Sequence, residues 1–272
     1  MVTRAPLSEP RPRRGWRWAL LGLAIGVLAA VVLFAPARWL SAALSGWTQG
    51  RLVLANPRGT VWNGTAAVVF ANGSGSSAGV NGAQAVSLPG VLHWRMRPGW
   101  GGISASLDLA CCAAQPIELR ASPRAGGLLL TWQDSRSRWP ATMLTGLGAP
   151  WNTLKLEGAL DLSTKAFAMQ WDGPALRIAG QATLDATDVS SSLSTLRPMG
   201  SYRLTLDGGP RPTLLLSTRE GSLELNGSGS WNGTSFRFNG EASAAPGRED
   251  ALSNLLNIIG RRDNARSIIT LG

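Results

Sequence analysis

Two patterns of apolar residues divide this chain into an N-terminal segment and a longer remainder. Residues 18–34 form a run of seventeen residues without a charge. A helix rises about 1.5 Å per residue, so this run approaches the roughly 30 Å of a bilayer core. From residue 52 onward, apolar side chains recur at every second position, which is the period of a half-buried strand. The pattern therefore predicts one membrane helix followed by a β-rich region.

The alternating positions extend over most of the remaining chain. They include Leu52/Leu54, Leu92/Trp94/Met96, Leu107/Leu109, Leu204/Leu206, Leu214/Leu216, Leu223/Leu225 and Phe236/Phe238. Asn-Gly steps begin at Asn63, Asn226, Asn232 and Asn239, and such steps favour type I′ hairpin turns. The predicted fold class is thus mainly β: an antiparallel meander whose sheet is open, barrel-like or groove-like.

Short helices interrupt the predicted strands. Residues 140–147 begin with proline and end near glycine. Residues 248–259 carry Glu249 and Asp250 in their first turn and place leucines on one face. An amphipathic piece at 40–47 precedes the strands, and a last strand is expected at 267–271. Gly59–Thr65 resembles the segment 229–234, so the β region is either two related subdomains or one domain that uses the same hairpin twice.

The N-terminal flank suggests an orientation for the membrane helix. Residues 1–17 contain five Arg and one Glu, a charge of +4, and such clusters stay on the cytoplasmic side. We expect a cytoplasmic tail (1–17), a transmembrane signal anchor (18–36) and a periplasmic domain (37–272). Ala35-Pro36-Ala37 offers an alternative, a cleaved signal peptide, but the apolar run is longer than a signal peptide requires and Arg38 follows at once. Trp16 and Trp18 at one end, and Trp39 and Trp47 at the other, suit the two membrane interfaces.

Charge and cysteine content narrow the classes of function. The remaining 21 basic and 15 acidic residues are dispersed, so the net charge of +10 does not indicate nucleic-acid binding. The two cysteines, Cys111 and Cys112, are adjacent. A disulfide between neighbours requires an unusual ring, and a bond between two chains is an alternative, but two small buried or half-buried residues at a strand end are the favoured interpretation.

The residues needed for catalysis are scarce. His93 is the single histidine and lies on a predicted strand, on the face opposite Leu92 and Trp94. Residues 75–79 match G-x-S-x-G, but they lie in a Gly/Ser-rich stretch rather than between a strand and a helix. No spacing suits a metal site. We therefore expect no catalytic, cofactor-binding or metal-binding residues, no small-molecule substrate and no enzymatic activity.

Several segments together resemble a known family, protein N of the type II secretion system, also called general secretion pathway protein N. They are the Arg-rich tail and anchor, Phe34–Leu40, Gly50–Ala55, Gly59–Gly64, Gly146–Leu154 and Leu255–Arg262. The resemblance implies a non-enzymatic inner-membrane protein of a Gram-negative bacterium. Its periplasmic domain would work as a scaffold with other secretion proteins, either the inner-membrane platform or the secretin.

A second interpretation shares the anchor and the meander. Periplasmic lipid-handling proteins of the AsmA-like kind combine one anchor with a long apolar β groove, and the sequence does not decide whether the apolar face is closed into a core or left as a groove. In the scaffold interpretation, tryptophans are the expected contact residues. The candidates are Trp62, Trp100, Trp132, Trp139, Trp151, Trp171 and Trp231.

Overall fold

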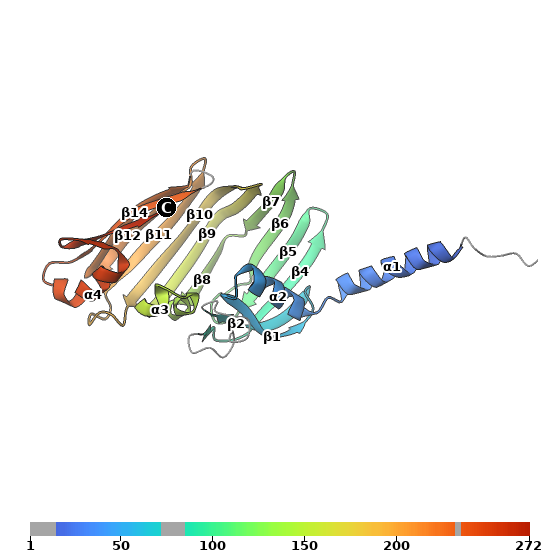
Figure 1. The fold of residues 1–272 in the computed structure, drawn as a ribbon, viewed down its shortest axis with the longest axis horizontal. Coiled ribbons are helices and arrows are strands. Elements are labelled where there is room, and N and C mark those ends of the chain that lie inside the picture. Colours follow the sequence, from blue (N-terminus) through green and yellow to red (C-terminus); the bar gives the residue numbers. More distant parts are fainter. Residues whose placement is uncertain (1–14, 72–84, 232–234) are drawn as a thin grey trace, which may run out of the picture.

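One large antiparallel sheet, preceded by a projecting helix, forms the fold (Figure 1). The computed structural model describes residues 15–71, 85–231 and 235–272. Within these ranges a 16-stranded sheet has the order β1-β2-β4-β5-β6-β7-β9-β10-β11-β12-β13-β14-β16-β15, with β3 beside β2 and β8 beside β9. Strand order thus follows chain order almost throughout, as a meander requires.

The helices are α1 (Gly15–Leu33), α2 (Ala37–Trp47), the 3₁₀ helix η1 (Ala141–Leu147), α3 (Trp151–Leu154) and α4 (Glu249–Ile259). The first strands are β1 (Leu52–Gly59), β2 (Asn63–Phe70), β3 (Val86–Ser87), β4 (Leu92–Gly99), β5 (Gly102–Leu109), β6 (Ile117–Arg124), β7 (Gly127–Trp132) and β8 (Ser135–Pro140). The later strands are β9 (Glu157–Asp172), β10 (Ala175–Ser190), β11 (Gly200–Gly209), β12 (Thr213–Gly221), β13 (Leu223–Trp231), β14 (Phe236–Ala244), β15 (Arg261–Asp263) and β16 (Arg266–Leu271).

The predicted mainly β fold is confirmed, and so are the two interrupting helices, as η1 and α4. The number of short helices is larger than predicted, because α2 and α3 are helical as well. The sheet is not closed, since β1 and β15 each pair with one strand only in the described part of the chain. β7 and β8 lie end to end along one side of β9, which is 16 residues long and pairs with both.

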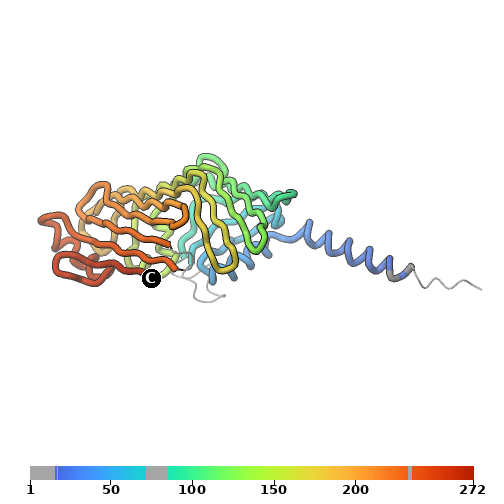
Figure 2. Tube along the Cα trace, turned by 90° about the horizontal axis from the view of Figure 1, so that it is seen from above, coloured from blue at the N-terminus to red at the C-terminus, as the bar shows by residue number. Residues whose placement is uncertain are grey.

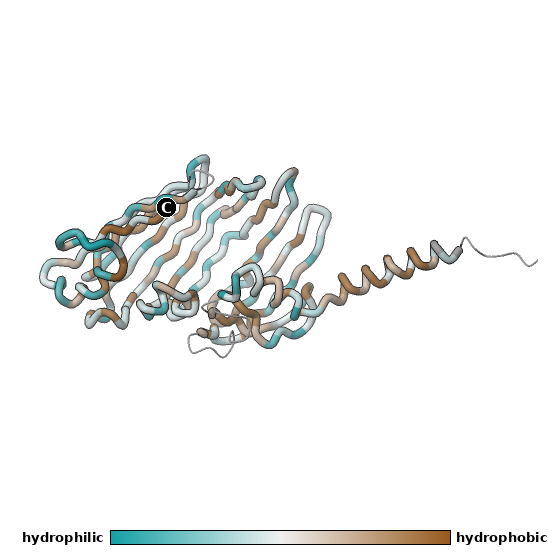
Figure 3. The backbone as a smooth tube through the Cα atoms, viewed as in Figure 1, coloured by the Kyte–Doolittle hydropathy of each residue, from teal (hydrophilic) through white to brown (hydrophobic). Residues whose placement is uncertain are grey.

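The sheet has an inner and an outer face. We call the face that the helices cover the inner face. At the C-terminal end, Leu252, Leu255 and Leu256 of α4 pack against the sheet residues Tyr202 and Ala242. Figure 3 shows that apolar and polar residues alternate along the strands. Burial of these leucines supplies most of the local stability of α4.

A second core lies at the N-terminal end of the same face. There α2 contributes Ala37, and Leu54, Val68 and Trp94 come from β1, β2 and β4. Trp94 is 2% exposed, and its indole N–H donates to the Val61 carbonyl at 3.0 Å. Figure 2 shows the sheet from above, with its two ends curled and the long strands between them.

Apolar side chains of the inner face continue between the two cores. A cross-strand row contains Ile103, Ala121, Leu130, Met169 and Ile178, none of which belongs to either core cluster. Ile178 is 7% exposed whereas Ile103 is 41% exposed. The inner face is therefore closed into cores at its ends and only partly covered between them.

The predicted Asn-Gly turns at residues 226 and 239 are wrong. Asn226-Gly227 lies within β13 and Asn239-Gly240 within β14, where Gly227 and Gly240 face one another. A Cβ atom on Gly227 would lie 2.5 Å from Cζ of Phe238, so the glycines make room for the aromatic ring. The step at Asn63 follows the β1–β2 turn, and the step at Asn232 lies outside the described residues.

Helix α1 projects from the sheet and most of its side chains are exposed (Figure 1). Its C-terminal end is held at the β1–β2 turn, where the Trp62 indole N–H donates to the Val32 carbonyl at 2.8 Å and the Val61 N–H donates to the Ala35 carbonyl at 2.8 Å. In the described part of the chain, no helix combines the length and hydropathy needed to cross a membrane. The transmembrane segment 18–36 stays a prediction, and the arginines before residue 15 lie outside the described residues.

Candidate interaction site on the outer face

A row of charged side chains crosses the outer face of the sheet. Arg138, Asp161, Asp185 and Arg203 are direct cross-strand neighbours on β8, β9, β10 and β11. Two carboxylates placed opposite each other repel, and each here has an arginine on its other side. Arg138 lies 3.6 Å from Asp161, and Arg203 lies 2.7 Å from Asp185.

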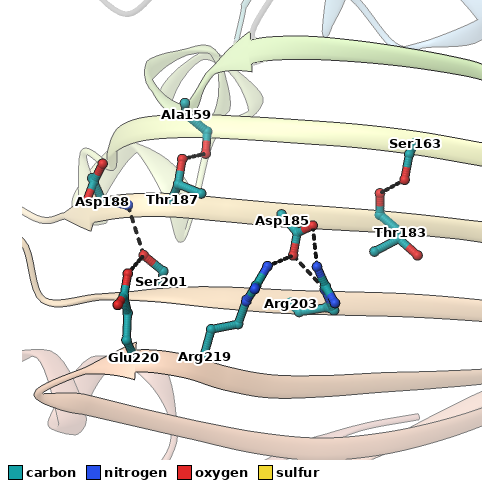
Figure 4. Close-up of polar contacts among 10 residues, drawn as sticks. All are labelled: Ala159, Ser163, Thr183, Asp185, Thr187, Asp188, Ser201, Arg203, Arg219 and Glu220. Carbon is teal, nitrogen blue, oxygen red and sulfur yellow. Dashed lines mark hydrogen bonds and ion pairs between the residues drawn. The ribbon is translucent and has the colours of Figure 1, made fainter.

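The pair of Asp185 and Arg203 has the best geometry in this row. The Nε and Nη2 groups of Arg203 donate to the two carboxylate oxygens at 2.7 and 2.8 Å, and Arg219 adds a longer contact at 3.5 Å (Figure 4). The hydrogen bond from Arg203 holds the pKa of Asp185 below its ordinary value of 3.8, although partial burial opposes the shift. The same contact raises the pKa of Arg203. Asp185 is therefore an anion that Arg203 holds in one orientation.

A β-bulge changes the end of β10 next to this row. Asp188 has φ 53°, and the pairing register shifts between Ala186 and Val189. As a result Val189, rather than Asp188, joins the C-terminal core. The Asp188 N–H donates to the Ser201 hydroxyl at 3.3 Å, and that hydroxyl donates to Glu220 at 3.3 Å (Figure 4). Simple alternation along the strand predicts no such bulge.

The charged row lines a groove. One depression of about 800 Å³ lies between the row and the turn of residues 110–114, and a second of about 820 Å³ continues it along residues 133–136. The two share Ala114, Arg136, Ser163 and Thr183, so they form one groove. Its lining combines guanidinium, carboxylate, hydroxyl and amide groups, which can hydrogen-bond to a polar protein surface.

The turn beside this groove contains a disulfide. Cys111 and Cys112 are bonded to each other, and Cys112 is 3% exposed. The cysteines follow the end of β5, as predicted, but the disulfide between neighbours, which the sequence does not favour, is present. The N–H groups of Cys112 and Ala113 both donate to the Leu109 carbonyl at 3.0 Å, so the chain turns tightly at the end of β5. Adjacent cysteines in a sequence do not reveal such a turn.

The residues considered as catalytic candidates do not line the outer-face groove in the described part of the chain. His93 is exposed on β4, on the face opposite the buried Trp94, as predicted. The described residues hold no group of three or more His, Cys, Asp or Glu side chains that could bind a metal. The G-x-S-x-G match at residues 75–79 lies outside the described residues. Charged pairs and hydroxyls along the groove remain available for contacts with another protein.

The candidate tryptophans differ sharply in exposure. Trp100 is 110% exposed and Trp151 is 38% exposed. The other five are partly buried; of these, Trp132 makes an edge-to-face contact with Phe167 and Trp139 donates to the Ser137 hydroxyl at 2.8 Å. The indole N–H of Trp62 is already hydrogen-bonded to the Val32 carbonyl of α1. Only Trp100 therefore presents a whole indole ring to solvent among these candidates.

Comparison with known proteins gives one match. A family model described as type II secretion system (T2SS), protein N matches residues 50–269. This range begins just before β1 and ends within β16, so it covers nearly the whole sheet. No curated protein and no solved structure matches the chain.

Proposed function

The chain belongs to the type II secretion system protein N family, and from this premise we propose that it is a non-enzymatic assembly protein anchored in the inner membrane. Its sheet would act as a periplasmic scaffold for export of folded proteins across the outer membrane. The observation that carries the proposal is the family match over residues 50–269, because that range contains the outer-face groove and nearly all the strands.

The proposed location rests on the N-terminal segment. Five arginines precede the apolar run, and such residues are retained on the cytoplasmic side. Apolar side chains around α1, including Leu23, Leu28 and Phe34, are 63%, 64% and 76% exposed. A helix that buries so little against its own domain is stabilised by an apolar surrounding. These features support an anchor over residues 18–36 with the sheet in the periplasm.

The two edges of the sheet differ in their capacity to accept a partner strand. At β1, the Ser41 hydroxyl of α2 donates to the Leu54 carbonyl at 2.7 Å, and Pro57 lacks an N–H donor. Both features protect an edge. At the other end, β15 pairs with Arg266–Ile268 only, so residues 269–271 of β16 have no strand beyond them in the described part of the chain. We place the proposed partner contact at this end of β16.

Site-specific photocross-linking tests this contact. A photoreactive amino acid at Thr270, which is exposed on β16, is expected to cross-link a secretion-system protein in envelopes of a complemented deletion strain. The matched control is Leu215, which is 55% exposed but lies on β12 within the sheet. Adducts of equal yield at both positions, or full secretion of a reporter exoenzyme by the deletion strain, would contradict the scaffold proposal.

One observation favours a second candidate function, lipid handling of the AsmA-like kind. The row from Ile103 to Ile178 crosses the partly covered inner face between the two cores. An acyl chain could cover such apolar side chains. Mass spectrometry of lipid that copurifies with the full chain tests this candidate. Stoichiometric phospholipid that is lost on Leu130→Asp substitution would favour it, and lipid-free protein would exclude it.

A further inference from the structure

The tip of the β4–β5 hairpin carries the most exposed tryptophan of the described chain. Trp100 is 110% exposed, so its ring has no packing contact within the protein. The tip is otherwise made of glycines, and an added Cβ atom on Gly101 would meet nothing within 4 Å. Indole rings favour the interface between bilayer and water, where the ring is desolvated and the N–H keeps a partner.

The hairpin is coupled to the end of α1. Trp62 accepts a hydrogen bond at its carbonyl from the Met96 N–H at 2.6 Å, and its indole binds the Val32 carbonyl. One residue thus holds both α1 and the middle of β4. At about 3.3 Å per residue, Trp100 lies roughly 13 Å beyond Met96 along the strand. Figures 1 and 2 both show this hairpin extending toward the side from which α1 leaves the sheet.

The β4–β5 hairpin carries positive charge, which suits an anionic surface. Arg95 and Arg97 are exposed on β4, and no Asp or Glu occurs from Val91 to Leu107. Arg124 is exposed at the end of the neighbouring β6. Guanidinium groups bind phosphates, and basic residues near a membrane are attracted to anionic lipids. A tryptophan tip above two arginines is therefore complementary to an anionic bilayer surface.

We propose that the β4–β5 hairpin is a second membrane contact of this protein. Trp100 enters the interfacial layer, while Arg95 and Arg97 bind the phosphates of anionic lipid headgroups. The inference rests on the anchor of the proposed function, because α1 brings the hairpin to the bilayer. With a helix and a hairpin both attached, the sheet is held in one orientation relative to the membrane.

Fluorescent labels on the full chain in lipid vesicles test the hairpin and the anchor separately. The variants are Gly101→Cys at the tip, Gly26→Cys in α1 and Gly46→Cys in α2, three glycines at which an added Cβ meets nothing within 4 Å. The two native cysteines are bonded to each other, so the new thiol is the one that reacts. The vesicles contain phosphatidylethanolamine, phosphatidylglycerol and a nitroxide-labelled quencher lipid.

The label at position 101 is expected to lose emission. The label at position 46, about 14 Å along α2 from its start, is expected to lose none. Adding Trp100→Ser and Arg97→Gln should abolish the loss at position 101 without changing the melting temperature, since both side chains are exposed. Vesicles of phosphatidylcholine alone should give a smaller loss. Quenching at position 26 but not at 101 overturns the hairpin contact and leaves the anchor. An unquenched label at position 26 overturns the anchor, and the hairpin contact then survives only if position 101 is still quenched.

Discussion

Asp185 is the residue around which the polar contacts of the outer face are arranged. Arg203 binds both of its carboxylate oxygens, and Arg219 reaches one of them. The pair joins β10 to β11 beside the groove, so it connects the stability of the sheet to the shape of the outer-face groove. The contribution of such a pair depends on pH, because only the carboxylate form accepts these bonds.

Substitution of Asp185 by Asn should change the pH dependence of stability. The folded-state pKa of Asp185 is below 3.8, so its contribution is present above about pH 4 and is lost as the pH falls toward the lowered pKa. The unfolding free energy of the variant should therefore be lower than that of the natural chain at pH 7, and the difference should shrink below pH 4. Chemical denaturation across this range measures it, and a constant difference would contradict the prediction.

His93 should be dispensable. Its side chain is exposed, and the described residues provide no cluster that would make it a metal ligand. The variant His93→Ala should restore secretion of a reporter exoenzyme to the level of the natural chain in a deletion strain. Loss of secretion at an unchanged protein level would reveal a role that the structure does not suggest.

Single residues also show what sequence reasoning could predict. Alternation correctly places His93 outside and Trp94 inside, because both lie in a regular strand. It does not pair Asp185 with Arg203, which are 18 positions apart and meet through the register of β10 and β11. It also does not distinguish Trp100 from Trp132, since exposure depends on where a hairpin ends relative to its neighbours.

At the scale of elements, glycine has a packing role in β13 and β14. Gly227, Gly229 and Gly240 lie under the rings of Phe236 and Phe238, which stack with centroids 6.5 Å apart. A glycine without a side chain allows an aromatic ring to lie flat across a strand, and the ring in turn protects the backbone. Asn-Gly in a sequence predicts a turn because both residues adopt φ > 0 easily. The same dipeptide in β13 and β14 instead provides a glycine on which an aromatic ring packs, and the sequence does not distinguish the two cases.

The substitution Gly227→Ala should destabilise the sheet by about 1–3 kcal/mol, the usual cost of adding a methyl group to a packed site. Its Cβ atom would lie 2.5 Å from Phe238 and 3.0 Å from the Cα of Gly240, so the ring or the backbone must move. Thermal melting measures the effect. The control Gly46→Ala fills open space in α2 and should raise stability, and a Gly227 variant that melts with the control would refute this packing role.

The helices were easier to predict than the irregular strand positions. α4 combines acidic residues at its start with three leucines on one face, and both signals are local. The bulges at Ala166 and Asp188 have positive φ values, which alanine and aspartate rarely adopt. β7 and β8 are two separate strands along one side of β9, and their positions depend on pairing with β9. Neither feature has a local signal.

At the scale of the whole molecule, the sheet has one face that the helices partly cover and one face that they leave open. Its inner face is closed at both ends by α2 and α4, and its outer face and β16 edge remain available to other proteins. The mainly β class and the family could be predicted because they depend on period and on the order of motifs. The single sheet with two cores could not, because each core gathers residues that are far apart in the chain, such as Ala37 with Leu109 and Leu154 with Leu252.

The proposed orientation predicts a protease pattern in spheroplasts. A tag placed before residue 15 should stay protected, because the arginines hold that segment in the cytoplasm, whereas a tag after Gly272 should be digested. Immunoblotting of both tags measures this outcome. Digestion of the first tag, or a mature chain that starts at Arg38, would contradict the anchor.

In the proposed periplasmic location, the strand order has a consequence for how the sheet forms during export. Each strand pairs mainly with its neighbour in sequence, so a hairpin can dock on the preceding one as soon as both have left the translocation channel. The β1 side is therefore built first, next to the proposed anchor. The edge of β16 forms only after β14 is in place, so a half-exported copy could not engage the proposed partner through it. Translocation order would thus act as a quality check, admitting only copies whose sheet has been completed.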